Sequence, residues 1–170
     1  MPRSLPNIII TGTPGTGKTS HAELLKSHIP ELVHYNIGSL VKSENLYEKY
    51  DEEWDSYIVD EDKLIDYLEP LVENGGCILD WHSCEVFPKR WIDLVAVLRT
   101  DHAILWDRLE ARGYSLRKIE ENNEAEIMEV VLAEARDSYD SEIIVELQSE
   151  NDADFALNVD RIVEWIQNWK

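Results

Sequence analysis

The stretch Gly12-Thr13-Pro14-Gly15-Thr16-Gly17-Lys18-Thr19 fits the phosphate-loop pattern G-x-x-x-x-G-K-[ST]. It directly follows the apolar run Ile8-Ile9-Ile10. Glycines let backbone N–H groups surround a phosphate, and a helix that begins after the loop points its positive end at the anion. We therefore predict a buried strand over residues 7–11, a helix over 18–28 and a nucleotide site between them.

Apolar runs alternate with helical patterns along the rest of the chain, which predicts an α/β fold with a parallel sheet and helices on both faces. We expect further strands at 33–36, 77–80, 94–98 and 143–147. We expect helices at 60–74, 103–112, 115–139 and 155–169. The acidic, aromatic segment 44–62 is expected to be an irregular excursion from a single domain, 1–170.

Composition restricts the environment of the protein. Its 170 residues, 44% hydrophobic and 30% charged, are typical of a soluble domain with a full core. The apolar stretches are shorter than the roughly 20 residues that span a bilayer, and no apolar leader precedes the first strand. The only cysteines, Cys77 and Cys84, fit a reducing compartment. We expect a monomer in the nucleus and cytoplasm, with no membrane association.

The net charge of −19 bears on possible partners. Strong direct binding of nucleic acid requires many lysines and arginines, so we do not expect it here. An acidic surface attracts basic partners. The alternative interpretation is that the charge only keeps the protein soluble.

Asp80 and His82 follow the predicted strand 77–80. A carboxylate at this position commonly organises Mg²⁺ together with the hydroxyl that ends the phosphate loop, here Thr19. His82 could orient water or relay a proton, although a lone histidine can also be structural. Because no glutamate directly follows Asp80, the sequence favours phosphoryl transfer to a bound acceptor over fast hydrolysis.

Several arginines follow the predicted strand 94–98. Arg112 precedes Gly113-Tyr114, which we interpret as the hinge of a lid. Arginines that a closing segment brings over phosphates stabilise developing charge and exclude water. Arg108 is expected instead to be a solvent-exposed helix charge paired with acidic neighbours.

The phosphate loop and several other segments resemble the adenylate kinase isoenzyme six family over nearly the whole chain. These segments are Asn36-Ile37-Gly38, Tyr50-Asp51-Glu52-Glu53, Asp80-Trp81-His82, Phe87-Pro88-Lys89-Arg90-Trp91, Val97-Leu98-Arg99-Thr100 and Arg112-Gly113-Tyr114. The resemblance implies a nucleoside-monophosphate-kinase fold with a five-stranded parallel sheet. It also implies a monophosphate-binding insertion at 35–59 and a short lid at 111–121.

The resemblance further implies reversible, Mg²⁺-dependent phosphoryl transfer from ATP to AMP, together with ATPase activity. It implies a role in nuclear maturation of the small ribosomal subunit and binding of a basic small-subunit ribosomal protein. The alternative is an assembly ATPase whose nucleotide state switches binding of that protein, with little metabolic kinase role.

Site residues follow from the resemblance and the motifs together. ATP is assigned to Gly15, Thr16, Gly17, Lys18, Thr19, Ser20 and Arg112, Mg²⁺ to Thr19 and Asp80, AMP to Gly38, Lys42 and Arg99, and catalysis to Lys18, Asp80, His82 and Arg112. Lys42 stands where an arginine is expected to face the monophosphate. A lysine offers a point charge in place of a bidentate fork, which predicts a weaker hold on AMP.

Overall fold

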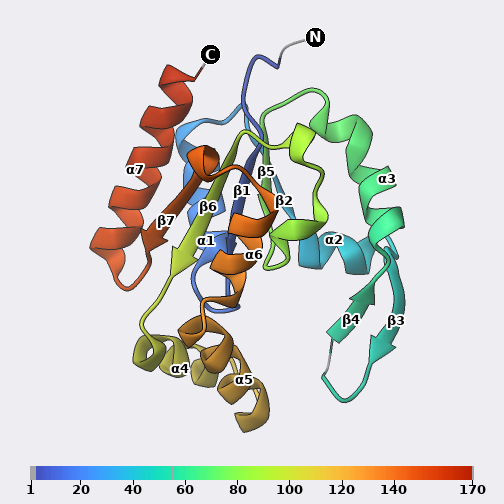
Figure 1. The fold of residues 1–170 in the computed structure, drawn as a ribbon, viewed down its shortest axis with the longest axis vertical. Coiled ribbons are helices and arrows are strands. Elements are labelled where there is room, and N and C mark those ends of the chain that lie inside the picture. Colours follow the sequence, from blue (N-terminus) through green and yellow to red (C-terminus); the bar gives the residue numbers. More distant parts are fainter. Residues whose placement is uncertain (1–2, 55, 170) are drawn as a thin grey trace.

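Five parallel strands form the central sheet in the order β2-β5-β1-β6-β7 (Figure 1). The computed structural model describes residues 3–54 and 56–169. The strands are β1 (Ile8–Gly12), β2 (Val33–Asn36), β5 (Cys77–Asp80), β6 (Leu94–Arg99) and β7 (Ile144–Gln148). The predicted five-stranded parallel sheet is confirmed. β1 lies between β5 and β6 in this order. Ligands of such sheets bind beyond the carboxyl ends of the strands, so the carboxyl end of β1 marks the expected site.

Helices cover both faces of the sheet, as predicted (Figure 1). α1 (Lys18–His28) and α7 (Asp152–Asn168) lie on one face, and α3 (Glu61–Val72) and α6 (Val130–Ser138) lie on the other. The run in β1 serves both sides: Ile8 and Ile10 join the core under α1 and α7, and Ile9 joins the opposite core. All three are fully buried, which explains why the strand is apolar without alternation.

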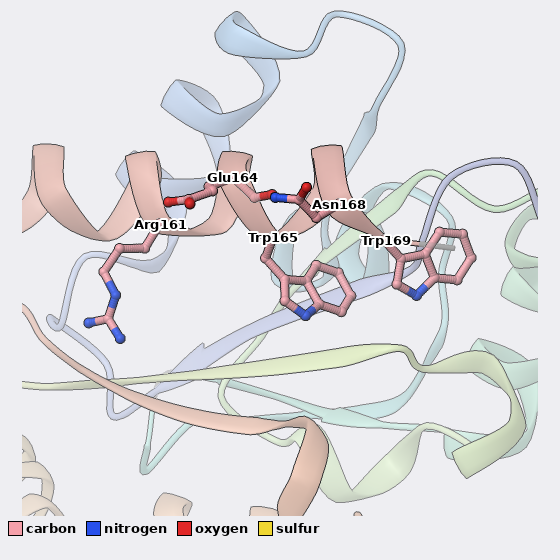
Figure 2. A pocket seen from close by; sticks show the side chains of 5 residues that line it. All are labelled: Arg161, Glu164, Trp165, Asn168 and Trp169. Atoms are coloured by element: carbon pink, nitrogen blue, oxygen red, sulfur yellow. The ribbon is translucent and has the colours of Figure 1, made fainter.

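Helix α7 also carries a pocket far from the phosphate loop. Arg161, Glu164, Trp165, Asn168 and Trp169 line this pocket of about 490 Å³ (Figure 2). The helix ends at the edge of the sheet where β1 begins, and the phosphate loop follows the other end of β1 (Figure 1). We therefore do not assign this pocket to the nucleotide. Within the described residues, no helix is long and apolar enough to cross a membrane.

The insertion after β2 is more ordered than the sequence suggested. It contains α2 (Ile37–Ser43) and an antiparallel hairpin of β3 (Tyr47–Asp51) and β4 (Ser56–Val59). The prediction of an irregular segment over 44–62 is therefore wrong. Its aromatic residues are cross-strand pairs: the ring centroid of Tyr57 lies 4.5 Å from that of Tyr47 and 5.2 Å from that of Tyr50.

The predicted helix 115–139 is also wrong, because it is two helices. α4 (His102–Ala111) is followed by α5 (Leu116–Ile127), and α6 begins only at Val130. Between them Glu129 has a φ of 57°, in the left-handed region that ends helices. Its carboxylate is held by Arg99 at 2.8 Å. The chain contains no glycine or proline here, so periodicity alone could not reveal the break.

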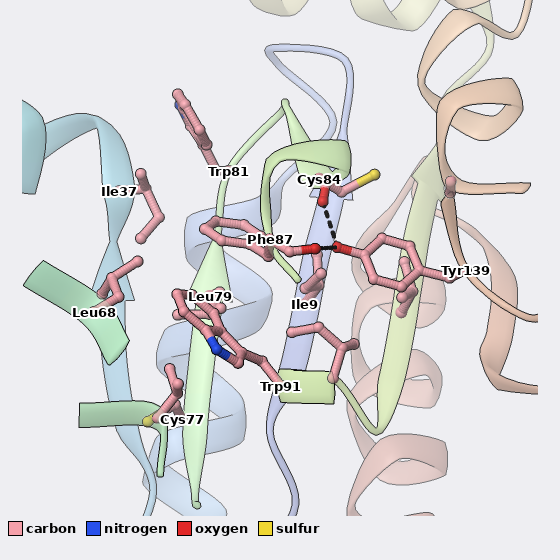
Figure 3. Packing of buried hydrophobic residues seen from close by; sticks show 14 of the residues in the cluster. Ile9, Ile37, Leu68, Cys77, Leu79, Trp81, Cys84, Phe87, Trp91 and Tyr139 are labelled. Atoms are coloured by element: carbon pink, nitrogen blue, oxygen red, sulfur yellow. Dashed lines mark hydrogen bonds between the residues drawn. The ribbon is translucent and has the colours of Figure 1, made fainter. Parts of the chain in front are cut away.

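The buried Tyr139, at the end of α6, holds the loop after β5 in place through two hydrogen bonds (Figure 3). The loop contains the short 3₁₀ turns η1 (Cys84–Val86) and η2 (Lys89–Trp91). The hydroxyl of Tyr139 donates to the carbonyl oxygens of Cys84 at 2.6 Å and Phe87 at 2.7 Å. Phe87 and Trp91, on the same loop, are buried. This packing fixes the loop that carries His82.

Candidate functional site

The phosphate loop presents its backbone to the carboxyl end of the sheet. Among the described residues, none caps the first turn of α1 with a side chain, and Gly17 at its start has a φ of 98°. The first N–H groups of the helix are therefore available to an anion. Lys18 Nζ donates to the carbonyl oxygens of Gly12 at 3.0 Å and Thr13 at 3.4 Å. Burial lowers the pKa of Lys18 to about 8, with Asp80 opposing the shift.

A cluster of polar side chains surrounds Asp80, which is 3% exposed. Its Oδ2 accepts hydrogen bonds from Thr19 Oγ1 at 2.8 Å and His34 Nε2 at 2.9 Å. Asn36 Nδ2 lies 3.4 Å from Thr19 Oγ1. Thus the structure brings together Thr19 and Asp80, the two predicted magnesium ligands. A buried carboxylate beside a hydroxyl is a donor set that suits Mg²⁺.

Sequence reasoning missed the role of His34. It lies on β2, which pairs with β5 so that Asn36 stands opposite Asp80. Only the order of strands in the sheet identifies β2 as the neighbour of β5, and that order cannot be read from the sequence. The polar alternation of His34 and Asn36 on a short strand is the one signal that could have suggested it.

Helix α4, which leads into the predicted lid, packs against the phosphate loop. Gly15 has a φ of 95°, in the left-handed region that favours glycine, and an added Cβ would lie 2.8 Å from a methyl group of Leu105 and 2.9 Å from one of Leu109 on α4. Arg108 Nη1 donates to the Gly15 carbonyl oxygen at 3.3 Å. The expectation that Arg108 is a solvent-exposed charge is therefore wrong. Arg112 is exposed one turn later, at the end of α4.

Three adjoining pockets surround these residues. The loop pocket, about 500 Å³, is lined by Gly15, Gly17, Ser20, His21, Arg108, Ala111, Arg112, Ser149, Glu150, Asn151, Asp152 and Phe155. The central pocket, about 620 Å³, includes Thr13, Lys18, Trp54, Ser56, His82, Ser83, Arg112, Tyr114, Lys118 and Glu134. The hairpin pocket, about 460 Å³, includes Gly38, Lys42, Ser56, Tyr57, Glu61, Trp81, His82 and Ser83. Arg112 lines the first two, and His82 lines the last two.

His82 stands where the central and hairpin pockets meet. Its ring centroid lies 5.3 Å from that of Trp81, in an edge arrangement. The protein groups packed around it and the charge of Lys18 lower the pKa of the His82 imidazole, although the side chain remains exposed to the pocket. A neutral ring at pH 7 can accept a proton or orient a water molecule.

Lys42 and Gly38, both predicted to contact AMP, line the hairpin pocket. Lys42 Nζ lies 5.6 Å from the ring centroid of Tyr57, over its face. The ammonium group therefore rests on the hairpin, at a cation–π distance.

Arg99, the third residue predicted to contact AMP, is placed elsewhere. It binds Glu126 at 2.9 Å, Glu129 at 2.8 Å and Glu146 at 3.6 Å, which fixes the junction of α5 and α6. Glu126 is 3% exposed and also accepts from Thr13 Oγ1 at 2.8 Å. The guanidinium thus holds the C-terminal end of α5, and Glu126 is a contact to the phosphate loop that the sequence did not reveal.

Comparison with known proteins agrees with this geometry. Residues 8–129 match the protein family described as AAA domain. The adenylate kinase isoenzyme 6 homolog of Schizosaccharomyces pombe is 57% identical over 168 residues, which cover 99% of this chain and 95% of that protein. The homolog of Saccharomyces cerevisiae is 54% identical over 164 residues, 96% of this chain and 83% of that protein. The chain belongs to the adenylate kinase isoenzyme 6 family.

Solved structures show the same fold at low identity. Shikimate kinase from Acinetobacter baumannii, in complex with shikimate, has a TM-score of 0.67 at 15% identity and covers 99% of this chain, which covers 97% of it. Shikimate kinase from Bacteroides thetaiotaomicron has a TM-score of 0.62 at 15% identity, covering 96% and 99% respectively. This member of the adenylate kinase isoenzyme 6 family is therefore a phosphate-loop, kinase-like enzyme that acts on nucleotides.

Proposed function

We propose that this protein transfers the γ-phosphoryl group of Mg²⁺–ATP to AMP, reversibly, and hydrolyses ATP when no acceptor is bound. One observation carries the proposal: the three pockets share lining residues, so they lie next to one another in a row past the phosphate loop. ATP fits the loop pocket, the transferring group fits the central pocket beside Lys18 and Arg112, and AMP fits the hairpin pocket. Resemblance of the chain to adenylate kinase isoenzyme 6 homologs supports this assignment.

The chemistry balances without a base. An oxygen of the AMP phosphate forms a bond to the γ-phosphorus while the bond from that phosphorus to the β–γ bridging oxygen breaks, leaving two ADP and no proton to move. Catalysis then consists of positioning and charge stabilisation. Lys18 and Arg112 contribute positive charge beside the transferring group.

A magnesium ion would be held by Thr19 and Asp80, whose oxygen atoms suit it. When bound, the ion would neutralise charge that develops on the phosphates. Hydrolysis differs from transfer because the attacking water must lose a proton. In this proposal the neutral imidazole of His82 accepts that proton or orients the water.

The transfer reaction is tested by measuring ADP formation from Mg²⁺–ATP with AMP, without AMP and with other monophosphates. We expect an AMP-dependent increase; equal rates with and without AMP would contradict the proposal.

Variants of Lys42 test whether its ammonium group binds the phosphate of AMP. Lys42→Ala should raise the KM for AMP and Lys42→Arg should lower it, because arginine can bind a phosphate through two hydrogen bonds. Lys49→Ala, on the exposed surface of β3, is the matched control.

A second function is favoured by the net charge of −19. In it, the nucleotide state switches binding to a basic small-subunit ribosomal protein during maturation of that subunit in the nucleus, with the protein also present in the cytoplasm. An acidic surface attracts a basic partner and repels free nucleic acid. Pull-down of the partner with apo, ADP-bound and ATP-bound protein tests it, and equal binding in all states would exclude the switch.

A further inference from the structure

Arg117 joins the tip of the β3–β4 hairpin to the predicted lid. Arg117, in the first turn of α5, donates from Nη1 to Glu53 Oε1 at 2.7 Å. Its guanidinium lies 4.6 Å from the ring centroid of Trp54, over the indole face. Arg117 Nε also lies 3.8 Å from Glu121 Oε1, one helical turn along α5. Thus a single side chain joins two segments that are distant in the sequence.

Both segments form walls of the cavity. Trp54 and Ser56 of the hairpin line the central pocket, and Arg112 and Lys118 of the lid line it from the other side. Ser56 also lines the hairpin pocket. The contact through Arg117 therefore joins two segments that both line the central pocket. It keeps the acceptor side of the cavity next to the lid.

We propose that Arg117 is a positioning residue that holds the hairpin against the lid, so that the acceptor meets the transferring phosphoryl group and water is excluded. The proposal rests on the transfer function proposed above. Arg117 itself lines none of the three pockets around the phosphate loop, so it acts through Glu53 and Trp54. The carboxylate fixes the direction of the guanidinium, and the indole supplies a flat surface for it.

The contact between Arg117 and Glu53 is exposed to solvent, as expected where the hairpin and the lid must separate again to release products. The side chain of Arg117 is 60% exposed and that of Glu53 is 64% exposed. Exposed ion pairs contribute little free energy, and the cation–π contact adds a similarly modest amount. Such a contact shifts an equilibrium between open and closed forms without trapping either. Products can therefore leave.

The chain contains a matched control at Arg90. Arg90 Nη2 lies 2.6 Å from Glu69 Oε1, and its guanidinium lies 5.9 Å from the ring centroid of Trp91. It is likewise exposed, but it joins α3 to η2 and lines none of the three pockets. Arg90→Ala therefore removes the same kind of group without touching the cavity.

The kinetic test compares Arg117→Ala with Arg90→Ala. We expect Arg117→Ala to raise the KM for AMP roughly tenfold and to lower the ratio of transfer to hydrolysis, with the KM for ATP changed less than about twofold. Arg117→Lys should recover part of the loss. The double variant with Glu53→Arg and Arg117→Glu should be closer to the parent protein, in the KM for AMP and in the ratio of transfer to hydrolysis, than either single variant. Equal effects of the two alanine variants, or a parallel rise in the KM for ATP, would overturn the proposal.

A distance measurement separates this proposal from the transfer function. Cysteines introduced by Glu52→Cys and Glu120→Cys can carry paired spin labels, because Cys77 and Cys84 are buried and burial raises the pKa of both thiols. We expect one short distance in the parent protein and a longer, broader distribution with Arg117→Ala. An unchanged distribution would overturn the positioning role even where transfer is observed. If the parent protein shows no AMP-dependent transfer but Arg117→Ala still lengthens the distance between the labels, only the transfer function is overturned.

Discussion

The phosphate-loop half of the cavity and the closing half are held together by different kinds of contact. In the first, Asp80 and Glu126 are each 3% exposed, and their carboxylates accept hydrogen bonds from fixed partners. In the second, Arg117 and Glu53 are 60% and 64% exposed. Breaking a buried pair costs about 3–5 kcal/mol, whereas an exposed pair contributes about 0–1 kcal/mol.

This difference separates permanent structure from movable structure. The phosphate loop and Asp80 are held by buried contacts within the protein, so binding of ATP there requires little rearrangement. The hairpin and the predicted lid are joined by exposed contacts, which are weak enough to allow the opening that we propose. Variants that remove buried groups should therefore have large effects on donor binding or stability, and variants of exposed groups should have small ones.

The largest effect is expected from Lys18→Ala in the phosphate-loop half. Its ammonium group is partly buried and donates to two carbonyl oxygens that a phosphate would replace. Loss of this charge should weaken Mg²⁺–ATP binding roughly a hundredfold, the equivalent of about 2.7 kcal/mol. Titration calorimetry measures it.

Lys26→Ala is the matched control for that variant. Lys26 lies on the same helix, and its Nζ also donates to two carbonyl oxygens, those of Leu32 at 2.6 Å and Pro30 at 3.3 Å. It lines none of the three pockets around the phosphate loop. ATP affinity that falls equally in both variants would show a general effect on α1 and would contradict a role for Lys18 in binding phosphate.

The next largest effect is expected among the partners of Arg99. Glu126 is buried and Glu129 is exposed, so the same substitution at each compares a buried contact with an exposed one. Glu126→Gln places an amide among buried donors from Thr13 and Arg99, which should lower the free energy of unfolding by about 2 kcal/mol. Glu129→Gln changes a carboxylate that is 53% exposed and should lower it by at most about 0.5 kcal/mol. Urea unfolding measures both. Equal losses would mean that burial does not decide the strength of these contacts.

Much of the phosphate-loop half could be predicted from the sequence. The loop and its strand and helix depend on local pattern, and Asp80 follows a strand whose end could be placed. The contact from His34 to Asp80 could not be predicted, because it depends on the order of strands in the sheet. The bond from Arg108 to the Gly15 carbonyl depends likewise on how α4 packs.

Less of the closing half could be predicted. The hairpin was missed because its aromatic residues follow cross-strand pairing and not the simple alternation of a half-buried strand. The break at Glu129 was missed because a residue other than glycine adopts the left-handed conformation there, held by Arg99. Both features depend on contacts between segments distant in the sequence, which local propensity does not encode.

A smaller effect is expected at His82, where the two halves meet. His82→Ala should reduce ATP hydrolysis without AMP roughly tenfold, less than the usual ~10²-fold for a proton acceptor because solvent reaches this exposed site. AMP-dependent transfer should change less than about threefold, since the attacking phosphate has no proton to lose. Phosphate release and ADP formation measure the two reactions. The exposed His102→Ala is the control. Equal loss of both reactions would assign His82 a structural role.

The smallest effect is expected at Glu134, on α6 in the wall of the central pocket. Burial and the neighbouring carboxylate of Glu85 raise the pKa of Glu134 to about 7. The folded state therefore holds a proton that the unfolded state releases at lower pH, so this contribution to stability is complete below about pH 4.5 and is lost as the pH rises to about 7. Glu134→Gln should remove that decline.

Urea unfolding of the parent protein and Glu134→Gln between pH 4.5 and 8 measures this difference. The exposed Glu124→Gln, which removes one charge from α5, is the control and should keep the decline of the parent protein. Because an amide cannot ionise, Glu134→Gln should approach the parent protein in stability at low pH and exceed it at pH 8. A difference between the two proteins that stays constant from pH 4.5 to 8 would assign the titration to another group.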